Sequence, residues 1–278
     1  DMDNFLMSYE TKNGEPVPFT KLWFRDPDLK LYKKRDFIPY AHVEKSPKDV
    51  YNMFKGFRAS KLPYDISLEE RNTRIEPYLR VLKANCGGND KAYDYLTNWF
   101  AQQVQFPLDR PKTAPVQKGE EGGGKSEGYL YFGNDILGEE YVKECTRPDR
   151  ELFGTFQTAF ANKMFVIVDE CDLYKYSTEL LSAITGKKSG HERKNENIID
   201  VRSTHSMVFT SNKTNQIKLG KDGRRFFVLQ NDESLNPILA KDKKEAEKFW
   251  TYWWDEWKLD DRNARAVYDY FMDVKIPE

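Results

Sequence analysis

Residues 119–126 carry a glycine-rich pattern that can hold the phosphates of a nucleoside triphosphate. In this pattern, G-x-x-x-x-G-K-[ST], backbone N–H groups face the phosphates, Lys125 reaches the β and γ oxygens, and the Ser126 hydroxyl joins the shell of a Mg²⁺ ion. Glycines are needed because a Cβ would block the approach of the backbone. ATP and Mg²⁺ are therefore the expected cofactors. The expected binding residues are Gly119, Gly122, Gly123, Gly124, Lys125 and Ser126.

Two acidic residues follow an apolar run downstream of this loop. Residues 164–168 are rich in β-branched side chains, as in strands buried on both faces, and Asp169 and Glu170 come directly after them. Carboxylates at the end of a buried strand suit a metal ion and a water molecule. We expect Asp169 to hold Mg²⁺ and Glu170 to orient or deprotonate the water that attacks the γ-phosphate. The alternative is a pair of solvated acids at a strand end.

Further polar residues border two later strands. Asn212 follows a buried run at residues 205–210, and an amide there can hydrogen-bond the γ-phosphate and the attacking water. An ordinary turn residue is the alternative. Arg224 and Arg225 precede a strand at residues 226–229, where the fixed fork of guanidinium donors can reach the phosphates of a neighbouring subunit. A solvated turn arginine is the alternative for each of the two.

The order and spacing of these motifs resemble those of the superfamily 3 helicases of viruses, phages and plasmids. Residues 95–105 and 51–57 are similar to the region that precedes the motor in poxvirus-type primase-helicases and in phage primase-polymerases. The resemblance extends from residue 50 to residue 229. It implies an α/β fold of the AAA+ type, with a P-loop core whose mostly parallel sheet lies between helices. It also implies a ring of six subunits with ATP at the subunit interfaces.

The resemblance also assigns roles. Arg225, or else Arg224, is implied to be the arginine finger that acts on the ATP of a neighbouring subunit. The loop departs from the family pattern at Gly123, where family members more often carry a small hydroxyl residue or alanine. Acidic Glu120 and Glu121 would repel phosphates unless they point away. The residues implied to be catalytic are Lys125, Glu170, Asn212, Arg224 and Arg225, and those implied to bind metal are Ser126 and Asp169.

A local excess of positive charge lies at residues 181–225. This segment has ten Lys or Arg and four acidic residues, whereas the whole chain has a net charge of −1. Such a segment can bind nucleic-acid phosphates in a sequence-independent and salt-sensitive way. A solvated loop is the alternative. In the family a hairpin here projects into the ring channel, so the resemblance implies that DNA is gripped by Lys187, Lys188, Arg193 and Lys194.

The elements that must position these residues divide the chain into four parts. A strand at residues 112–118 leads into the glycine loop, and a helix at residues 126–136 follows it. Helices at residues 150–163 and 176–186 are expected to connect the buried strands. The four parts are a mixed lead-in region (1–67), a helical subdomain (68–112), the AAA+ superfamily 3 motor core (113–231) and a C-terminal helical segment (232–278).

The remaining features of the sequence are a tryptophan stripe, three cysteines and the absence of a long apolar run. Packing explains the helical spacing of the stripe better than stacking on bases does. The three cysteines are odd in number and far apart, which favours a reducing, intracellular compartment, the host cytoplasm if the protein is viral or phage. There is no apolar run long enough to span a bilayer, so no membrane partner is expected. The stripe consists of Trp250, Trp253, Trp254 and Trp257.

Together these features predict an ATP-dependent DNA helicase motor of a viral, phage or mobile-element replication protein. It would hydrolyse ATP at the interfaces of a homo-hexamer, move along single-stranded DNA and unwind forked DNA. Because the first residue is Asp1, we expect an excised piece with a primase or polymerase module upstream. The alternative is a nucleotide-dependent DNA-binding or loading module that hydrolyses ATP without unwinding. A structural protein with a fortuitous loop is a third interpretation.

Overall fold

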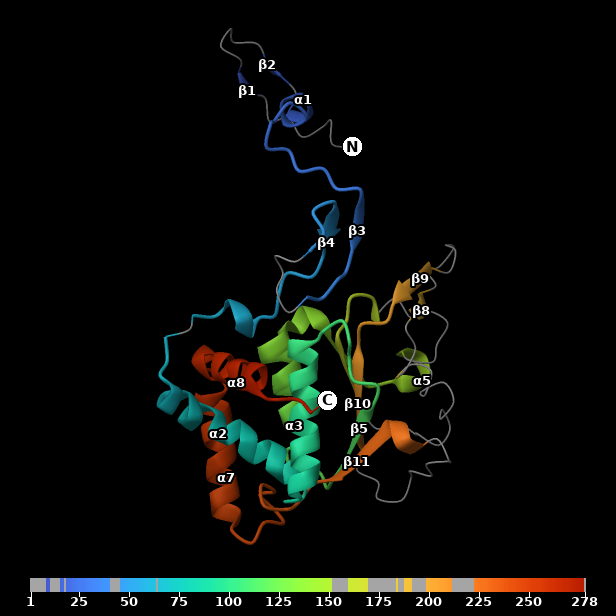
Figure 1. Cartoon of the computed structure of the whole chain (residues 1–278). Helices are drawn as coiled ribbons and strands as arrows, with labels where there is room; N and C mark the ends of the chain where they lie inside the picture. Colours follow the sequence, from blue (N-terminus) through green and yellow to red (C-terminus); the bar gives the residue numbers. More distant parts are fainter. Residues whose placement is uncertain are drawn as a thin grey trace. The chain divides into compact units, whose positions relative to one another are not determined.

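The computed structural model describes most of the chain and divides it into two compact units, Asp1–Phe37 with Ser46–Met53 and Ile38–Lys45 with Phe54–Glu278 (Figure 1). The described residues of the smaller unit form short elements: α1 (Phe19–Trp23), the antiparallel pair β1 (Tyr9–Glu10) and β2 (Pro16–Val17), and the parallel pair β3 (Lys34–Asp36) and β4 (Val50–Asn52). The described residues are 9–10, 16–17, 19–40, 46–63, 65–151, 160–169, 184, 188–191, 199–211 and 223–277.

Two helices precede the sheet of the larger unit, within the residues 68–112 for which the sequence predicts a helical subdomain. Helix α2 (Leu68–Asn85) begins where the Ser67 side chain accepts a hydrogen bond from the Glu70 N–H. Helix α3 (Asp90–Gln105) begins in the same way, with the Asn89 side chain accepting from the Ala92 N–H. Such caps satisfy backbone donors that the first turn leaves without a partner.

The core of the larger unit is a five-stranded sheet in which every pairing is parallel. The strand order is β11-β5-β10-β7-β6, so the strand of the glycine loop and the strand of Asp169 are separated by β10 alone. Val116, Val168 and Phe209 lie in the buried centre. The predicted strands are confirmed; β6 is an addition. The bounds are β5 (Ala114–Lys118), β6 (Val142–Cys145), β7 (Phe165–Asp169), β10 (Ser206–Ser211) and β11 (Phe226–Gln230).

The helix predicted after the loop is only partly α-helical. It begins as α4 (Glu127–Tyr131) and continues as the π-helix η4 (Phe132–Gly138). Of the two connecting helices, residues 152–159 and most of 176–186 lie outside the described residues. The remaining short elements are η3 (Ala59–Lys61), η5 (Glu139–Tyr141), α5 (Pro148–Glu151), the antiparallel pair β8 (Lys188–His191) and β9 (Ile199–Arg202), and η7 (Gly223–Arg225).

The C-terminal segment is helical, as predicted, and packs on α2 and α3 (Figure 1). The Phe100 ring lies 4.4 Å from Phe132 and 5.5 Å from Phe271 between ring centroids, which ties the three parts of the helical layer together. Of the tryptophan stripe, Trp253 and Trp257 are buried and stacked at 4.4 Å, as the packing interpretation predicts, whereas Trp254 is 46% exposed. The elements are α7 (Lys243–Tyr252), the π-helix η8 (Trp253–Trp257) and α8 (Asp261–Asp273).

Candidate functional site

The glycine loop and the Asp169 carboxylate lie at the same edge of the sheet. The loop leaves the carboxyl end of β5 at Lys118, which pairs with Ser211, the last residue of β10. Asp169 is the last residue of β7 and pairs with Thr210. Because all these strands run in parallel, their carboxyl ends meet, and that edge is where open α/β sheets bind their ligands.

The loop has the backbone that its glycines allow. Gly122 and Gly124 have positive φ angles of 82° and 71°, which side chains with a Cβ rarely adopt. A Cβ on Gly119 would lie 2.6 Å from the Cβ of Asn231, so only glycine fits there. Glu120 and Glu121 are both exposed. Neither side chain is therefore packed against the body of the protein.

Three asparagine side chains hold the loop through its backbone carbonyls. Asn231 donates to the Gly123 carbonyl at 2.9 Å, and Asn236 donates to the Glu121 carbonyl at 3.1 Å. Asn85, at the end of α2, donates to the Lys125 carbonyl at 3.2 Å. Sequence reasoning missed all three, because a lone asparagine next to a strand or helix end is an ordinary turn residue. The loop is thereby fixed by two separate elements before any ligand is bound.

Trp250 of α7 covers the loop at Gly124. A Cβ on Gly124 would lie 2.1 Å from the indole ring of Trp250, so the ring rests directly on the glycine. The indole Nε1 donates to the Leu235 carbonyl at 2.6 Å, which fixes the orientation of the ring. The sequence predicts a packing role for Trp250, and its packing partner is the glycine loop.

Lys125 and Ser126 occupy the end of the loop. The Lys125 ammonium donates to the Gly119 carbonyl at 3.4 Å. Ser126 precedes α4, and its hydroxyl makes no capping hydrogen bond to that helix. Next in the chain, buried Glu127 accepts from Lys258 at 2.9 Å and from the Trp253 indole at 3.0 Å. Burial raises the pKa of Glu127, and Lys258 opposes that shift.

Asp169 is exposed, and its Oδ1 accepts a short hydrogen bond from the hydroxyl of buried Thr210. Thr210, which sequence reasoning missed, therefore orients the carboxylate that we expect to bind Mg²⁺. Carboxylate and hydroxyl oxygens are the ligand types that this ion prefers, and it usually takes few of them from protein. Within the described ranges no three His, Cys, Asp or Glu side chains converge as a metal-binding group. Glu170 and Asn212 lie outside the described residues.

The two candidate arginine fingers lie at the other edge of the sheet. Arg224 and Arg225 form the short helix η7, directly before β11, whose first residue Phe226 pairs with Ala114, the first residue of β5. At about 3.3 Å per residue, the five-residue strand β5 separates the arginines from the glycine loop by about 15 Å. The structure thus does not bring the arginines together with the loop of the same chain.

Of the four candidate DNA contacts, only the backbone of Lys188 is described. It begins β8, where it pairs with Arg202 of β9. Lys187, Arg193 and Lys194 lie outside the described residues. Arg110 forms hydrogen bonds to residues near β9. Its guanidinium donates to the Ser203 hydroxyl at 3.0 Å and to the Ile184 carbonyl at 2.5 Å. Burial lowers the pKa of Arg110 to about 10.

A family model matches the region around the glycine loop. Residues 118–225, less than half of the chain, match a family described as a family of unknown function (DUF5906). No curated protein matches the chain. In the part of the chain that the structure describes, no helix is long and apolar enough to cross a bilayer.

Solved structures of the NrS-1 C-terminal region have a similar fold. An apo structure of this region and its A form each superpose with a TM-score of 0.66 at 18% sequence identity. The similarity covers 95% of this chain but only 62% of the NrS-1 chain. At this identity the comparison establishes a shared fold, an α/β arrangement with a five-stranded parallel sheet flanked by helices.

Proposed function

We propose that this chain is an ATP-hydrolysing motor that moves along single-stranded DNA and unwinds forked duplex. It would serve as the helicase module of a viral, phage or mobile-element replication protein and work as a ring of six copies. The observation that carries the proposal is the shared edge, where the glycine loop after β5 and the Asp169 carboxylate after β7 lie at the same end of one parallel sheet.

Nucleotide binding rests on the loop. Its backbone N–H groups and glycines are suited to the β- and γ-phosphates, and the three asparagines preset its shape, which lowers the entropy lost on binding. Lys125, whose ammonium now meets the Gly119 carbonyl, would exchange that neutral partner for phosphate oxygens. Ser126 and Asp169 would hold Mg²⁺, which when bound neutralises charge on the phosphates.

The remaining roles follow from sequence position and from the sheet. Glu170, directly after β7, would orient or deprotonate the attacking water, and Asn212, directly after β10, would hydrogen-bond the γ-phosphate and that water. Arg224 and Arg225 are too far from their own loop, so they would act on the ATP of a neighbouring copy. The basic residues around β8 would contact the DNA backbone.

The shared fold with the NrS-1 C-terminal region supports this reading at the level of architecture. The resemblance to superfamily 3 helicases in motif order supports it at the level of residues. The first line uses the path of the backbone, and the second uses the types and spacing of side chains.

Substitution of the loop lysine tests the proposal. Lys125→Ala should lower DNA-stimulated ATP hydrolysis by at least about a hundredfold, because it removes a charge placed on the reacting phosphates. The control is Lys241→Ala, an exposed lysine before α7. Hydrolysis and release of a strand from a tailed duplex are measured together. Parental turnover in the Lys125→Ala chain would reject the proposal, and hydrolysis without strand release by the parental chain would favour the loading module.

A further inference from the structure

We propose that copies of this chain join head to tail by inserting an apolar knob, Ile238 and Leu239, into an aromatic pocket of the next copy. The knob stands beside the glycine loop, and the pocket stands beside the two arginines. This inference rests on the proposed function, because the arginines of one copy must reach the nucleotide of another. It adds the two surfaces that would bring them together.

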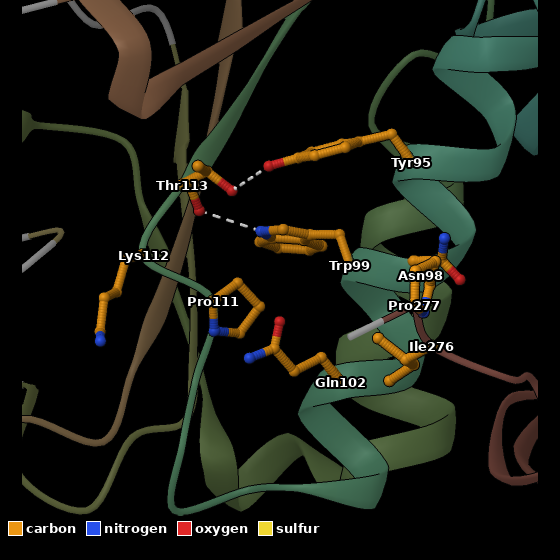
Figure 2. A pocket seen from close by; sticks show the side chains of 9 residues that line it. All are labelled: Tyr95, Asn98, Trp99, Gln102, Pro111, Lys112, Thr113, Ile276 and Pro277. Carbon is orange, nitrogen blue, oxygen red and sulfur yellow. Dashed lines mark hydrogen bonds between the residues drawn. The ribbon is translucent and has the colours of Figure 1, made fainter.

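The pocket lies between α3, the residues that lead into β5, and the residues after α8 (Figure 2). Its volume is about 360 Å³. The hydroxyl groups of Tyr95 and Thr113 form a hydrogen bond of 2.8 Å, and the Trp99 indole donates a hydrogen bond to the Thr113 carbonyl at 2.9 Å. Because these polar ends already have partners, the 41% exposed Tyr95 offers ring surface to an occupant, while Trp99, only 3% exposed, forms the base of the pocket. Pro111, Ile276 and Pro277 add apolar walls.

The pocket belongs to the same edge of the sheet as the arginine pair. Thr113 directly precedes Ala114, and Ala114 pairs with Phe226, which directly follows Arg225. The Tyr95 ring also lies 4.4 Å from the ring of Phe227, between centroids. The pocket and the arginine pair therefore lie at the same end of β5 and β11.

The knob belongs to the opposite edge. Ile238 is 68% exposed and Leu239 is 42% exposed. Their backbone N–H groups donate to the Asn236 side-chain oxygen at 2.9 and 3.2 Å, while the Asn236 amide donates to the Glu121 carbonyl. The turn is therefore fixed to the glycine loop. An apolar pair held in one conformation loses little entropy when it enters a pocket.

Charge favours a second copy as the occupant. Around the knob, exposed Glu120, Glu121 and Glu233 outnumber exposed Lys241, whereas around the pocket exposed Lys112 and Arg224 outnumber exposed Asp109. Opposite signs on the two edges attract copies in the head-to-tail orientation and oppose like edges meeting. A contact between two different surfaces is heterologous, the type that builds rings. The loop acids, unfavourable next to phosphates, then acquire a partner in the neighbouring copy.

Three variants of the 278-residue chain test the two surfaces separately. Ile238→Asp removes the knob, and Asn98→Arg places a long charged side chain at the half-buried rim of the pocket. Leu259→Asp is the matched control, because Leu259 is an exposed leucine away from both edges. Assembly is measured by analytical ultracentrifugation with a non-hydrolysable ATP analogue and single-stranded DNA, and unchanged thermal unfolding confirms that each variant is folded.

Ile238→Asp and Asn98→Arg should each raise the protein concentration at half-assembly by at least about tenfold, as truncation of a central apolar anchor does, while Leu259→Asp should match the parent. A mixture of the two defective variants should form two-chain species and no larger ones. In that mixture the intact knob of one variant fits the intact pocket of the other, and the remaining surfaces are defective. Two-chain species in the mixture are specific to a head-to-tail contact between these two surfaces.

Parental assembly by Ile238→Asp, absence of two-chain species in the mixture, or a parental chain that never assembles would each overturn the inference. ATP hydrolysis is recorded on the same samples. A chain that assembles through knob and pocket without hydrolysing ATP refutes the proposed function alone. A chain that hydrolyses ATP and assembles equally well without the knob refutes the docking inference alone.

Discussion

Gly124 shows how tightly a single loop position is constrained. Its positive φ angle excludes most side chains, and the Trp250 ring fills the space where a Cβ would lie. We therefore expect the main cost of a substitution here to be steric, with the backbone preference adding to it. Nucleotide affinity should fall as well, because the loop must shift to relieve the contact.

Gly124→Ala should lower the free energy of unfolding by more than about 2 kcal/mol and weaken ATP binding. Gly88→Ala is the control, since Gly88 has nearly the same φ angle, 70° against 71°, and nothing within 4 Å of the added Cβ. It should cost about 1 kcal/mol and leave ATP binding unchanged. Chemical denaturation and equilibrium binding of a fluorescent ATP analogue measure the two effects. Equal losses in the two variants would show that the Trp250 contact is unimportant.

Thr210 is the second residue whose role can be isolated. Thr210→Val keeps the shape of the side chain but removes the donor to Asp169. We expect the Mg²⁺ concentration at half-maximal ATP hydrolysis to rise about tenfold, because partners of a metal-binding carboxylate set its orientation. The control is Ser206→Ala in the same strand, whose hydroxyl makes no hydrogen bond within the described part of the chain. An unchanged Mg²⁺ requirement in Thr210→Val would remove Asp169 or Thr210 from the metal site.

Among the elements, the π-helix η4 contains a partly buried acid, Asp135. Burial raises the pKa of Asp135 to about 6, although Lys258 and Arg58 lower it. Its Oδ2 is buried without a hydrogen-bond partner among the described residues. The folded pKa thus exceeds the unfolded value of about 3.9, so the carboxylate destabilises the folded chain as the pH rises through this window.

Asp135→Asn should therefore raise the free energy of unfolding by about 1–2 kcal/mol at pH 8, with allowance for partial exposure, and leave it unchanged at pH 4. Urea denaturation at the two pH values measures the difference. A gain of equal size at both values would mean that the effect arises from packing and not from ionisation.

The elements also show what the sequence could predict. Residues 119–126, the buried runs before Asp169 and Ser211, and the capped helices α2 and α3 could be located because each has a local pattern of its own. Strand β6 could not be located in this way. Its four residues, Val142–Cys145, form an edge strand in which buried and exposed positions do not alternate regularly. The exposure of Trp254 could not be predicted either. The stripe assumes the residue spacing of an α-helix, and the π-helical turn η8 changes that spacing.

The asparagines and Thr210 escaped prediction for a different reason. Asn231 and Asn236 bind backbone carbonyls more than 100 positions away in the chain, and a carbonyl carries no signature in the sequence. Thr210 resembles any β-branched residue in a buried strand until its neighbour Asp169 is known. Contacts of this kind depend on the order of strands in the sheet, which local patterns do not specify.

For the whole molecule, the chain's charge distribution makes a prediction about DNA. Replacing Lys187, Lys188, Arg193 and Lys194 with alanine should weaken single-stranded DNA binding and flatten the plot of log affinity against log salt by up to about 3 units. The control replaces exposed Lys241, just before α7, and exposed Lys243 and Lys244 at its start. Fluorescence anisotropy over a series of salt concentrations measures both. An equal change in the control would indicate general charge attraction without a specific DNA-contacting segment.

The positions of the arginine pair and the glycine loop, at opposite ends of β5 and β11, affect how activity should scale with the amount of protein. Under the proposed function, a lone copy would bind ATP but would lack the cation that speeds its cleavage, so specific activity should fall on dilution. Copies that lack both arginines should lower the ATP hydrolysis of a mixed population, since each one leaves the functional copy beside it without an arginine at its ATP. A cell that carries both forms would then lose more activity than the share of altered chains suggests.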